Sequence, residues 1–123
     1  MKRILIVEDE SLILKALEFR LKRDGYDVLK AADGREGIRM IETEDFHLLI
    51  TDMMLPFNNG LGVVNKAKEI KGKGFPVIVL SNVGLENVVL EAFKLGADDY
   101  ITKPFSPAEL SIRVKRLLNN FTA

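Results

Sequence analysis

Acidic side chains follow two of the most apolar segments of the chain. Glu8 and Asp9 come directly after the run at residues 3–7, and Asp52 comes directly after the run at 48–51. If both runs are strands of one parallel sheet, their carboxyl ends meet at the same edge and the three carboxylates lie together. Their mutual repulsion would raise their proton affinity unless a cation neutralised them. The sequence therefore predicts a site for Mg²⁺, which prefers oxygen ligands.

Two further apolar runs lead into a lysine and a serine. Lys103 follows the run at 100–101 after one intervening threonine, and Ser81 follows the run at 77–80. Beside Mg²⁺ and the acids, the ammonium of Lys103 is suited to pairing with a phosphoryl oxygen. The hydroxyl of Ser81 can donate a hydrogen bond into the same pocket. The simpler alternatives are that the acids and Ser81 cap helices or turns and that Lys103 is a surface lysine.

These residues need a scaffold in which strands and helices alternate. Unbroken apolar runs are typical of parallel strands that are covered on both faces, and the segments between them repeat apolar residues at helical spacing. The fold class that follows is α/β, a doubly wound five-stranded parallel sheet with five helices on both faces. The predicted strands are 3–7, 27–31, 48–51, 77–80 and 100–101, and the predicted helices are 11–24, 35–42, 61–70, 85–95 and 107–120.

Length and composition exclude several classes of protein. The chain has 123 residues, enough for one domain, and 18 basic residues balance 18 acidic ones, which argues against direct nucleic-acid binding. There is no cysteine, so disulfides and thiolate chemistry are excluded and a reducing compartment such as the cytoplasm is expected. The apolar runs are too short to span a membrane. A protein partner or a small charged group is the expected ligand.

The motifs together resemble the response-regulator receiver domains of two-component signalling, in particular the chemotaxis receiver and the receivers of winged-helix transcription factors. The resemblance rests on the pair Glu8 and Asp9, the string at 52–56 with Gly60, Ser81 after a strand, and the segment 96–105. It implies the flavodoxin-like strand order 2-1-3-4-5. Residues 1–121 would form one receiver domain, with 122–123 as a tail or the start of a linker to an output domain.

The resemblance also implies the roles of the acidic residues. Asp52 would be the phosphoacceptor, which takes a phosphoryl group from the phosphohistidine of a sensor kinase. Asp9, Asp52 and the backbone carbonyl of Met54 would hold Mg²⁺, with Glu8 acting largely through water. Lys103 would neutralise phosphoryl oxygens. Such a protein assists its own phosphorylation and dephosphorylation and is not otherwise an enzyme.

A conformational switch is implied as well. In the family, the hydroxyl at the position of Ser81 moves toward the phosphoryl group, and the aromatic ring at the position of Tyr100 rotates into the space that is vacated. The bond between Lys103 and Pro104 would be cis. Two departures stand near the pocket: Asn82 is bulkier than the small residue usual after the switch hydroxyl, and Asn59 replaces a frequent aspartate.

Partner surfaces are expected on two sides. A stripe across the first helix would dock on the kinase, and a set of charges near the last strand and helix would pair across a phosphorylation-dependent homodimer. Val89 and Asn120 replace basic residues usual in such dimers, so one intersubunit ion pair should be missing. The docking residues are Leu12, Ala16 and Phe19 with Pro104 and Phe105, and the dimer residues are Asp98, Asp99, Glu109 and Arg113.

Three other functions remain as alternatives. A receiver-shaped module that binds partners without phosphorylation would not need the intact acids, Ser81 and Lys103. A Mg²⁺-dependent phosphohydrolase of the haloacid-dehalogenase type would need an aspartate two residues after Asp9, where the chain has Ser11. A flavodoxin-like flavin binder would need a glycine- and hydroxyl-rich phosphate loop after the first strand. His47 is expected to be a surface residue rather than a phosphodonor. The lysines at 66, 68, 71 and 73 are expected to complement the carboxyl end of the third helix rather than to bind nucleic acid.

Overall fold

The computed structural model describes every residue except 56–58, 83, 85 and 123. Five parallel strands form one sheet in the order β2-β1-β3-β4-β5, which confirms the predicted fold class and strand order. The described strands are β1 (Arg3–Val7), β2 (Asp27–Ala31), β3 (Leu48–Asp52), β4 (Val77–Asn82) and β5 (Asp99–Lys103). The described helices are α1 (Ser11–Arg23), α2 (Gly34–Thr43), α3 (Gly60–Lys71), α4 (Glu86–Lys94) and α5 (Pro107–Thr122).

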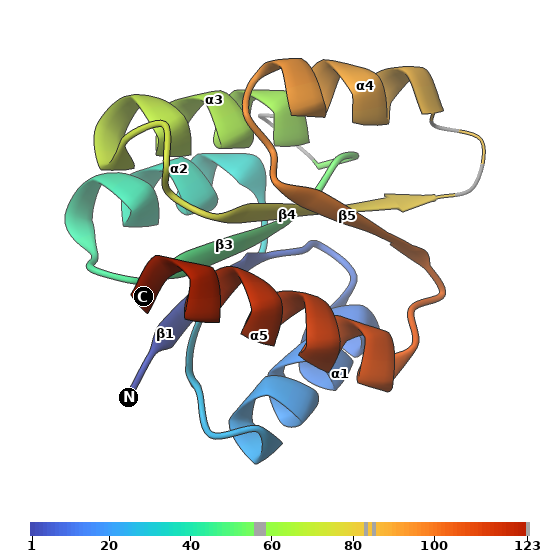
Figure 1. The fold of residues 1–123 in the computed structure, drawn as a ribbon. Helices are drawn as coiled ribbons and strands as arrows, with labels where there is room; N and C mark the ends of the chain where they lie inside the picture. The colour runs from blue at the N-terminus through green and yellow to red at the C-terminus, as the bar shows by residue number, and fades with distance from the viewer. Residues whose placement is uncertain (56–58, 83, 85, 123) are drawn as a thin grey trace.

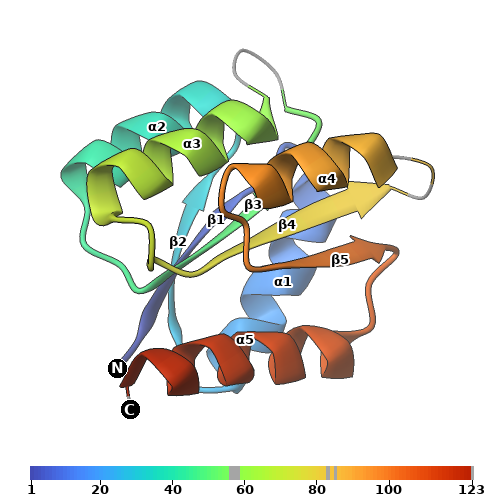
Figure 2. The same ribbon diagram turned by 45° about the horizontal axis from the view of Figure 1, so that its top comes forward.

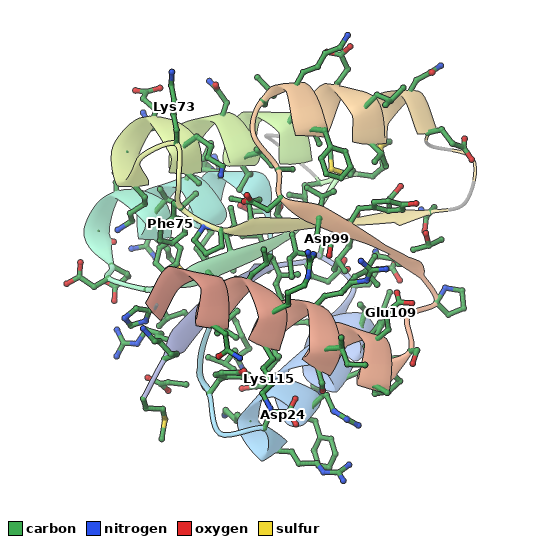
Figure 3. The ribbon with its side chains drawn as sticks, in the orientation of Figure 1. Asp24, Lys73, Phe75, Asp99, Glu109 and Lys115 are labelled. Carbon is green, nitrogen blue, oxygen red and sulfur yellow. The ribbon has the colours of Figure 1, made fainter. Side chains whose placement is uncertain are left out.

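Helices cover the sheet on both faces. Helices α1 and α5 lie on one face and α2, α3 and α4 lie on the other (Figures 1 and 2). Side chains fill the space between the sheet and both helix layers (Figure 3). The molecule is therefore a three-layer sandwich, as expected for parallel strands joined by helical crossovers.

Strand β1 shows why the apolar runs are unbroken. Successive side chains of a strand point to opposite faces, so a strand buried on both faces needs apolar residues at every position. Leu5 and Val7 belong to the core on the side of α2, α3 and α4, whereas Ile4 and Ile6 belong to the core on the side of α1 and α5. All four side chains are fully buried. The run positions the acids that follow it on a rigid support.

The helix boundaries differ slightly from the predicted ones, and capping explains two differences. Helix α2 begins at Gly34 because the side chain of Asp33 accepts a hydrogen bond of 2.8 Å from the backbone N–H of Glu36. Helix α3 begins at Gly60, one residue before the predicted start, because Asn59 caps it. The predicted start of the fourth helix, Leu85, lies outside the described residues. Among the described helices none is long and apolar enough to cross a bilayer.

Candidate functional site

Three carboxylates meet at the carboxyl ends of β1 and β3. Glu8, Asp9 and Asp52 each offer an oxygen that lies within 4.8 Å of the other two. Glu8 and Asp52 are buried, whereas Asp9 is exposed and opens the group to solvent. Parallel pairing of β1 with β3 brings these residues together although 43 positions separate Asp52 from Asp9. The cluster expected from the sequence is present.

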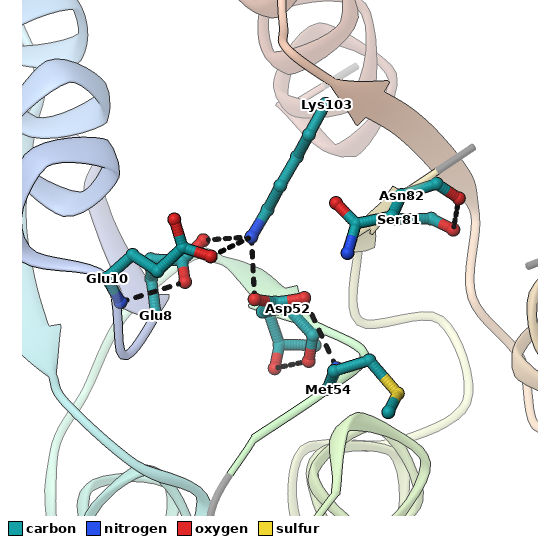
Figure 4. A network of polar contacts seen from close by, with 8 residues as sticks. Glu8, Glu10, Asp52, Met54, Ser81, Asn82 and Lys103 are labelled. Atoms are coloured by element: carbon teal, nitrogen blue, oxygen red, sulfur yellow. Dashed lines mark hydrogen bonds and ion pairs between the residues drawn. The ribbon is translucent and has the colours of Figure 1, made fainter.

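Lys103 enters this cluster from the end of β5. Its Nζ donates a hydrogen bond of 2.7 Å to Asp52 Oδ2 and lies 2.8 Å from Glu8 Oε1 (Figure 4). The exposed fractions of the three side chains are 7% for Lys103, 5% for Asp52 and 0% for Glu8, so solvent screens these ion pairs poorly. The bond between Lys103 and Pro104 is cis, which confirms the prediction.

Burial sets the charge states in the cluster. The pKa of Glu8 is raised from 4.5 to about 7, because burial and the neighbouring Asp52 raise it by more than the contact with Lys103 lowers it. Burial alone would lower the pKa of Lys103, but its contacts with Asp52 and Glu8 outweigh this effect and the net shift is upward. One ammonium thus pairs with two buried carboxylates, which leaves one negative charge without a partner. The raised pKa of Glu8 means that this carboxylate can take up a proton and remove that charge.

The donor set fits a hard divalent cation. All three clustered side chains offer carboxylate oxygens, the ligands that Mg²⁺ prefers. Glu8 Oε1 is buried, and the contact that it makes is its ion pair with Lys103 Nζ at 2.8 Å. Such an oxygen has coordination capacity to spare. A divalent cation at this place would neutralise the negative charge of the carboxylates that Lys103 alone does not balance.

The segment after β3 borders the cluster. The backbone N–H of Met54 donates a hydrogen bond of 3.2 Å to Asp52 Oδ1, and its side chain is exposed. A Cβ added to Gly60 would lie 2.3 Å from the backbone oxygen of Asp52, so only glycine permits α3 to begin this close to β3. Asn59 Oδ1 accepts a 3.0 Å hydrogen bond from the N–H of Gly62. Asn59 thus caps α3, a role not predicted from the sequence.

Beside the cluster, Ser81 and Asn82 end β4. The hydroxyl of Ser81 is buried and donates a hydrogen bond of 3.1 Å to the backbone oxygen of Asn82. Asn82 is exposed, and its amide lies on the side of the site that faces Asp52 (Figure 4). The Ser81 hydroxyl is therefore held by its own strand rather than by one of the carboxylates.

A mostly apolar cavity of about 370 Å³ lies beside Ser81 and is lined by residues of α4 and β5. Tyr100 and Phe93 line it, with ring centroids 6.1 Å apart in an edge-to-face contact. Tyr100 is 42% exposed, so its side chain lies at the surface as well as in the wall of the cavity. Val89 and Leu90 of α4 complete the apolar part of the lining. Space for an aromatic ring therefore exists next to the Ser81 hydroxyl.

The expected docking stripe lies on the surface of α1. Leu12 and Phe19 are 81% and 71% exposed, and Ala16 between them is exposed as well. Pro104 is exposed, whereas Phe105 is half-buried and packs against the core on the side of α1 and α5. These residues are available for contact with a partner, and their role as a kinase contact stays a prediction.

The charges expected at a dimer interface separate into two groups. Asp98 turns away from α5, and its Oδ2 accepts hydrogen bonds from Lys68 Nζ at 3.1 Å and from the N–H of Val77 at 2.8 Å. Asp99 turns toward α5, where Arg113 Nη1 lies 2.8 Å from both of its carboxylate oxygens. Glu109 Oε1 lies 3.6 Å from Arg113 Nε. Asp98 is thus bound on the opposite side of the sheet from Asp99, Glu109 and Arg113.

Lys68 and His47 do not contact the acidic cluster. Lys68 is 8% exposed, and its ammonium donates to the backbone oxygens of Lys73 and Phe75 in addition to Asp98. The ammonium of Lys68 thus joins the end of α3 to two loops, a contact that the sequence did not predict. His47 is exposed at the opposite end of β3, and its Nδ1 accepts a 3.0 Å hydrogen bond from the N–H of Arg3.

Comparisons with known proteins agree with this geometry. The chain is 43% identical over 117 residues to the alkaline phosphatase synthesis transcriptional regulatory protein PhoP of Bacillus subtilis, which covers 95% of this chain and 48% of PhoP. It is 40% identical over 115 residues to the transcriptional regulatory protein SrrA of Staphylococcus aureus, which covers 94% of this chain and 47% of SrrA. The chain thus spans about half the length of these relatives.

Solved structures of the same fold are also similar to this chain. The CheY-like receiver domain protein of Methanospirillum hungatei superposes with a TM-score of 0.92 at 34% identity and covers 98% of this chain and 95% of its own. The receiver domain of the Francisella response regulator 1452 has a TM-score of 0.89 at 30% identity and covers 98% and 99%. The family described as "Response regulator receiver domain" matches residues 4–115. The chain belongs to the response regulator receiver domain family of two-component signalling.

Proposed function

We propose that this receiver domain accepts a phosphoryl group on Asp52 from the phosphohistidine of a sensor histidine kinase. Receiver domains of response regulators interact with sensor histidine kinases and are signalling proteins rather than classical enzymes. The observation that carries the proposal is the position of Asp52, buried at the end of β3 between Lys103 at 2.7 Å and two further carboxylates. Among the described acids Glu8 shares this combination of a lysine and further carboxylates, and the family resemblance assigns the phosphoacceptor position to Asp52.

The residues of the chain divide the chemistry between them. A carboxylate oxygen of Asp52 forms a bond to phosphorus while the bond from phosphorus to the histidine nitrogen breaks, and the electron pair of that bond stays on the nitrogen. Lys103, already hydrogen-bonded to Asp52, lies close enough to pair with an oxygen of the incoming group. Because the transition state spreads charge over the phosphoryl oxygens, positioning and charge neutralisation account for most of the catalysis.

The acidic cluster is the place for the metal that receiver domains bind. Asp9, Asp52 and the backbone carbonyl of Met54 would hold Mg²⁺, with Glu8 acting largely through water. When bound, the ion supplies positive charge to the phosphoryl oxygens and offsets repulsion among the carboxylates. Glu8 would then release the proton that burial lets it keep near neutral pH.

Phosphorylation would reach the surface through Ser81 and Tyr100. The phosphoryl group brings the charge at Asp52 to about two units and adds three acceptor oxygens, so the Ser81 hydroxyl gains a stronger acceptor than the backbone oxygen of Asn82. The cavity of about 370 Å³ behind Ser81 can take the ring of Tyr100. The surface of α4, β5 and α5 would change as that ring leaves it. Asn82 borders the same space and is placed to alter the lifetime of the phosphoryl group.

Two surfaces would carry the partners. The exposed stripe of Leu12, Ala16 and Phe19, with Pro104 and Phe105 beside it, would dock on the kinase. A homodimer would form through α4, β5 and α5, with Asp99, Glu109 and Arg113 among its charges. Asp98 fits this dimer less well, because Lys68 and the N–H of Val77 already bind it.

A role in transcription follows from the relatives. PhoP and SrrA are named as transcriptional regulatory proteins, and each is about twice as long as the part that matches. We extend this role to the present chain: residues 1–121 would act as the receiver unit of a transcriptional regulator in the cytoplasm, with 122–123 leading toward an output domain.

Incubation with acetyl phosphate and measurement of the intact mass tests the proposal. We expect the wild type to gain one phosphoryl group when Mg²⁺ is present and almost none when EDTA removes it. Asp52→Asn is the test variant, and Asp33→Asn, which changes an acid outside the cluster, is its matched control. A wild type that gains no mass, or an Asp52→Asn variant that gains as much as wild type, contradicts the proposal and favours a module that binds partners without phosphorylation.

A further inference from the structure

Asp99 is the centre of an ion-pair cluster on the face formed by β5 and α5. Its Oδ1 accepts hydrogen bonds of 2.8 Å from the N–H of Tyr100 and from Arg113 Nη1. Its Oδ2 accepts hydrogen bonds of 2.8 Å from the same Arg113 atom and from Arg116 Nη2. An ionised carboxylate has about four acceptor positions. All of them are in use within one chain, so Asp99 has no position left for a donor from outside.

Burial makes this cluster different from an ordinary surface ion pair. The Asp99 side chain is only 9% exposed, whereas the side chains of Arg113 and Arg116 are 36% and 54% exposed. Hydrogen bonding to Asp99 raises the pKa of Arg113 against the lowering effect of burial. Arg116 thus reaches in from the solvent side and closes the cluster over Asp99.

A second copy of the chain is the partner that this face fits. Exposed apolar side chains of α4, β5 and α5 lie next to the ion-pair cluster, and helix α5 adds the exposed base Arg116 while α4 adds exposed glutamates. A two-fold contact brings each surface against itself, so a face that carries both signs of charge is self-complementary. The residues are Leu90, Phe93, Tyr100 and Ile112 for the apolar part and Glu86, Glu91 and Arg116 for the charged part.

We propose that Arg116 acts as an intrachain competitor: by occupying Asp99, it keeps that carboxylate from pairing with an arginine of a second copy and so restrains self-association of the unphosphorylated protein. This inference rests on the homodimer named under the proposed function and adds the contact that opposes it. Arg116 closes one acceptor position of Asp99 and repels an arginine that approaches from outside. Loss of Arg116 removes both obstacles and leaves Arg113 in place.

The cluster is also placed to respond to the proposed switch. The N–H of Tyr100 is one of the three donor atoms that contact Asp99, so the strand that carries the switch ring also holds the carboxylate. Movement of that residue changes the position of Asp99 relative to Arg113 and Arg116. A weaker hold by Arg116 would make Asp99 available to the second copy.

The experiment compares Arg116→Ala with Lys115→Ala by sedimentation velocity over a range of concentrations of unphosphorylated protein. Both changes remove one positive charge from exposed positions of α5. Lys115, however, lies on the side of α5 near Asp24, away from Asp99, which lies on the side of β5 (Figure 3). We expect Arg116→Ala to lower the dimer dissociation constant about fivefold, the equivalent of one exposed ion pair. Lys115→Ala should stay within about twofold of wild type.

The salt dependence separates competition from a structural effect. Because the competing contact is electrostatic, the difference between the two variants should shrink at about 1 M NaCl, where charges are screened beyond about 3 Å. An Arg116→Ala protein that dimerises no more tightly than Lys115→Ala, or stays monomeric at every concentration, overturns the inference. The measurement uses unphosphorylated protein, so a failure of Asp52 to take up a phosphoryl group, detected by mass, contradicts the proposed function without deciding this one.

Discussion

Replacing Lys103 by methionine removes the one ammonium that lies among the buried carboxylates. Methionine keeps the length and flexibility of the side chain but carries no charge. In the wild type, Nζ lies 2.7 Å from Asp52 Oδ2 and 2.8 Å from Glu8 Oε1, and both acids are almost completely buried. Removing one partner of a buried ion pair costs about 3–5 kcal/mol, because the remaining charge loses its compensation. The metal-free variant should therefore be strongly destabilised.

The cost should depend on pH in a defined direction. The pKa of Glu8 is raised from 4.5 to about 7, so the folded protein binds a proton that the unfolded chain has released, and stability falls as the pH rises through this window. Below pH 7 the wild type already holds Glu8 protonated, and only Asp52 loses its partner in the variant, at about 3 kcal/mol. Above pH 7 Glu8 must stay protonated in the folded variant, whereas in the folded wild type it releases its proton. The difference in free energy of unfolding between wild type and variant therefore grows by about 1.4 kcal/mol per pH unit.

Urea and thermal unfolding in EDTA at pH 6, 7 and 8 measure this difference. At pH 6 we expect the Tm to fall by about 12 °C, from about 4 °C per kcal/mol for a domain of this size. Glu8→Gln in the Lys103→Met background is the control, because it removes the titrating group and should abolish the growth above pH 7. Equal stability of variant and wild type, or a difference that does not change between pH 6 and 8, would refute the reasoning.

Three further predictions concern the metal, the loop and the docking stripe. Mg²⁺ binding should release close to one proton at pH 6 and far less at pH 8, because the pKa of Glu8 lies near 7; calorimetry in two buffers of different ionisation enthalpy measures this. Gly60→Ala should destabilise the fold by about 3 kcal/mol in urea unfolding, because its Cβ would lie 2.3 Å from the Asp52 backbone oxygen. Phe19→Asp should change stability by less than about 0.5 kcal/mol, leave uptake from acetyl phosphate unchanged and slow transfer from the kinase, as followed by phosphorylated-protein gels.

The position of the acidic cluster could be predicted because a general rule of parallel sheets connects sequence to space. Glu8 and Asp9 follow the largely apolar run at 3–7, Asp52 follows the run at 48–51, and the carboxyl ends of such runs share one edge of the sheet. Lys103 obeys the same rule on β5. The roles of these residues in phosphoryl transfer come from the family resemblance, because adjacency alone does not distinguish a phosphoacceptor from a metal ligand.

The ion-pair partners of individual side chains are harder to predict than the positions of the residues. Asp98 and Asp99 are neighbours in sequence and were assigned to one surface, yet Asp98 binds Lys68 while Asp99 binds Arg113 and Arg116. Consecutive residues at a strand point to opposite faces, a signal that was available once the strand was extended to Asp99. The burial of Lys68 gave no such signal, because the neighbouring lysines have the same composition and spacing as a solvated helix end.

Helix starts were missed for a different reason. The patterns Asp33 to Glu36 and Asn59 to Gly62 have the three-residue spacing of a side-chain cap, but glycine at the first helical position lowered the apparent helical tendency. Capping satisfies backbone donors that apolar periodicity does not detect. The predicted starts at 35 and 61 are therefore each one residue late.

The spacing of residues along strand β5 determines which side chains face the buried site and which face the surface. Its buried and exposed positions alternate, so that Lys103 faces the buried site and Tyr100, three residues earlier, faces the surface. An inserted or deleted residue between them would bring both side chains to one face, whereas most substitutions would leave their directions unchanged. The buried site at Lys103 and the surface residue Tyr100 are thus separated by an odd number of peptide units. Substitutions in this segment preserve that separation, whereas insertions and deletions change it.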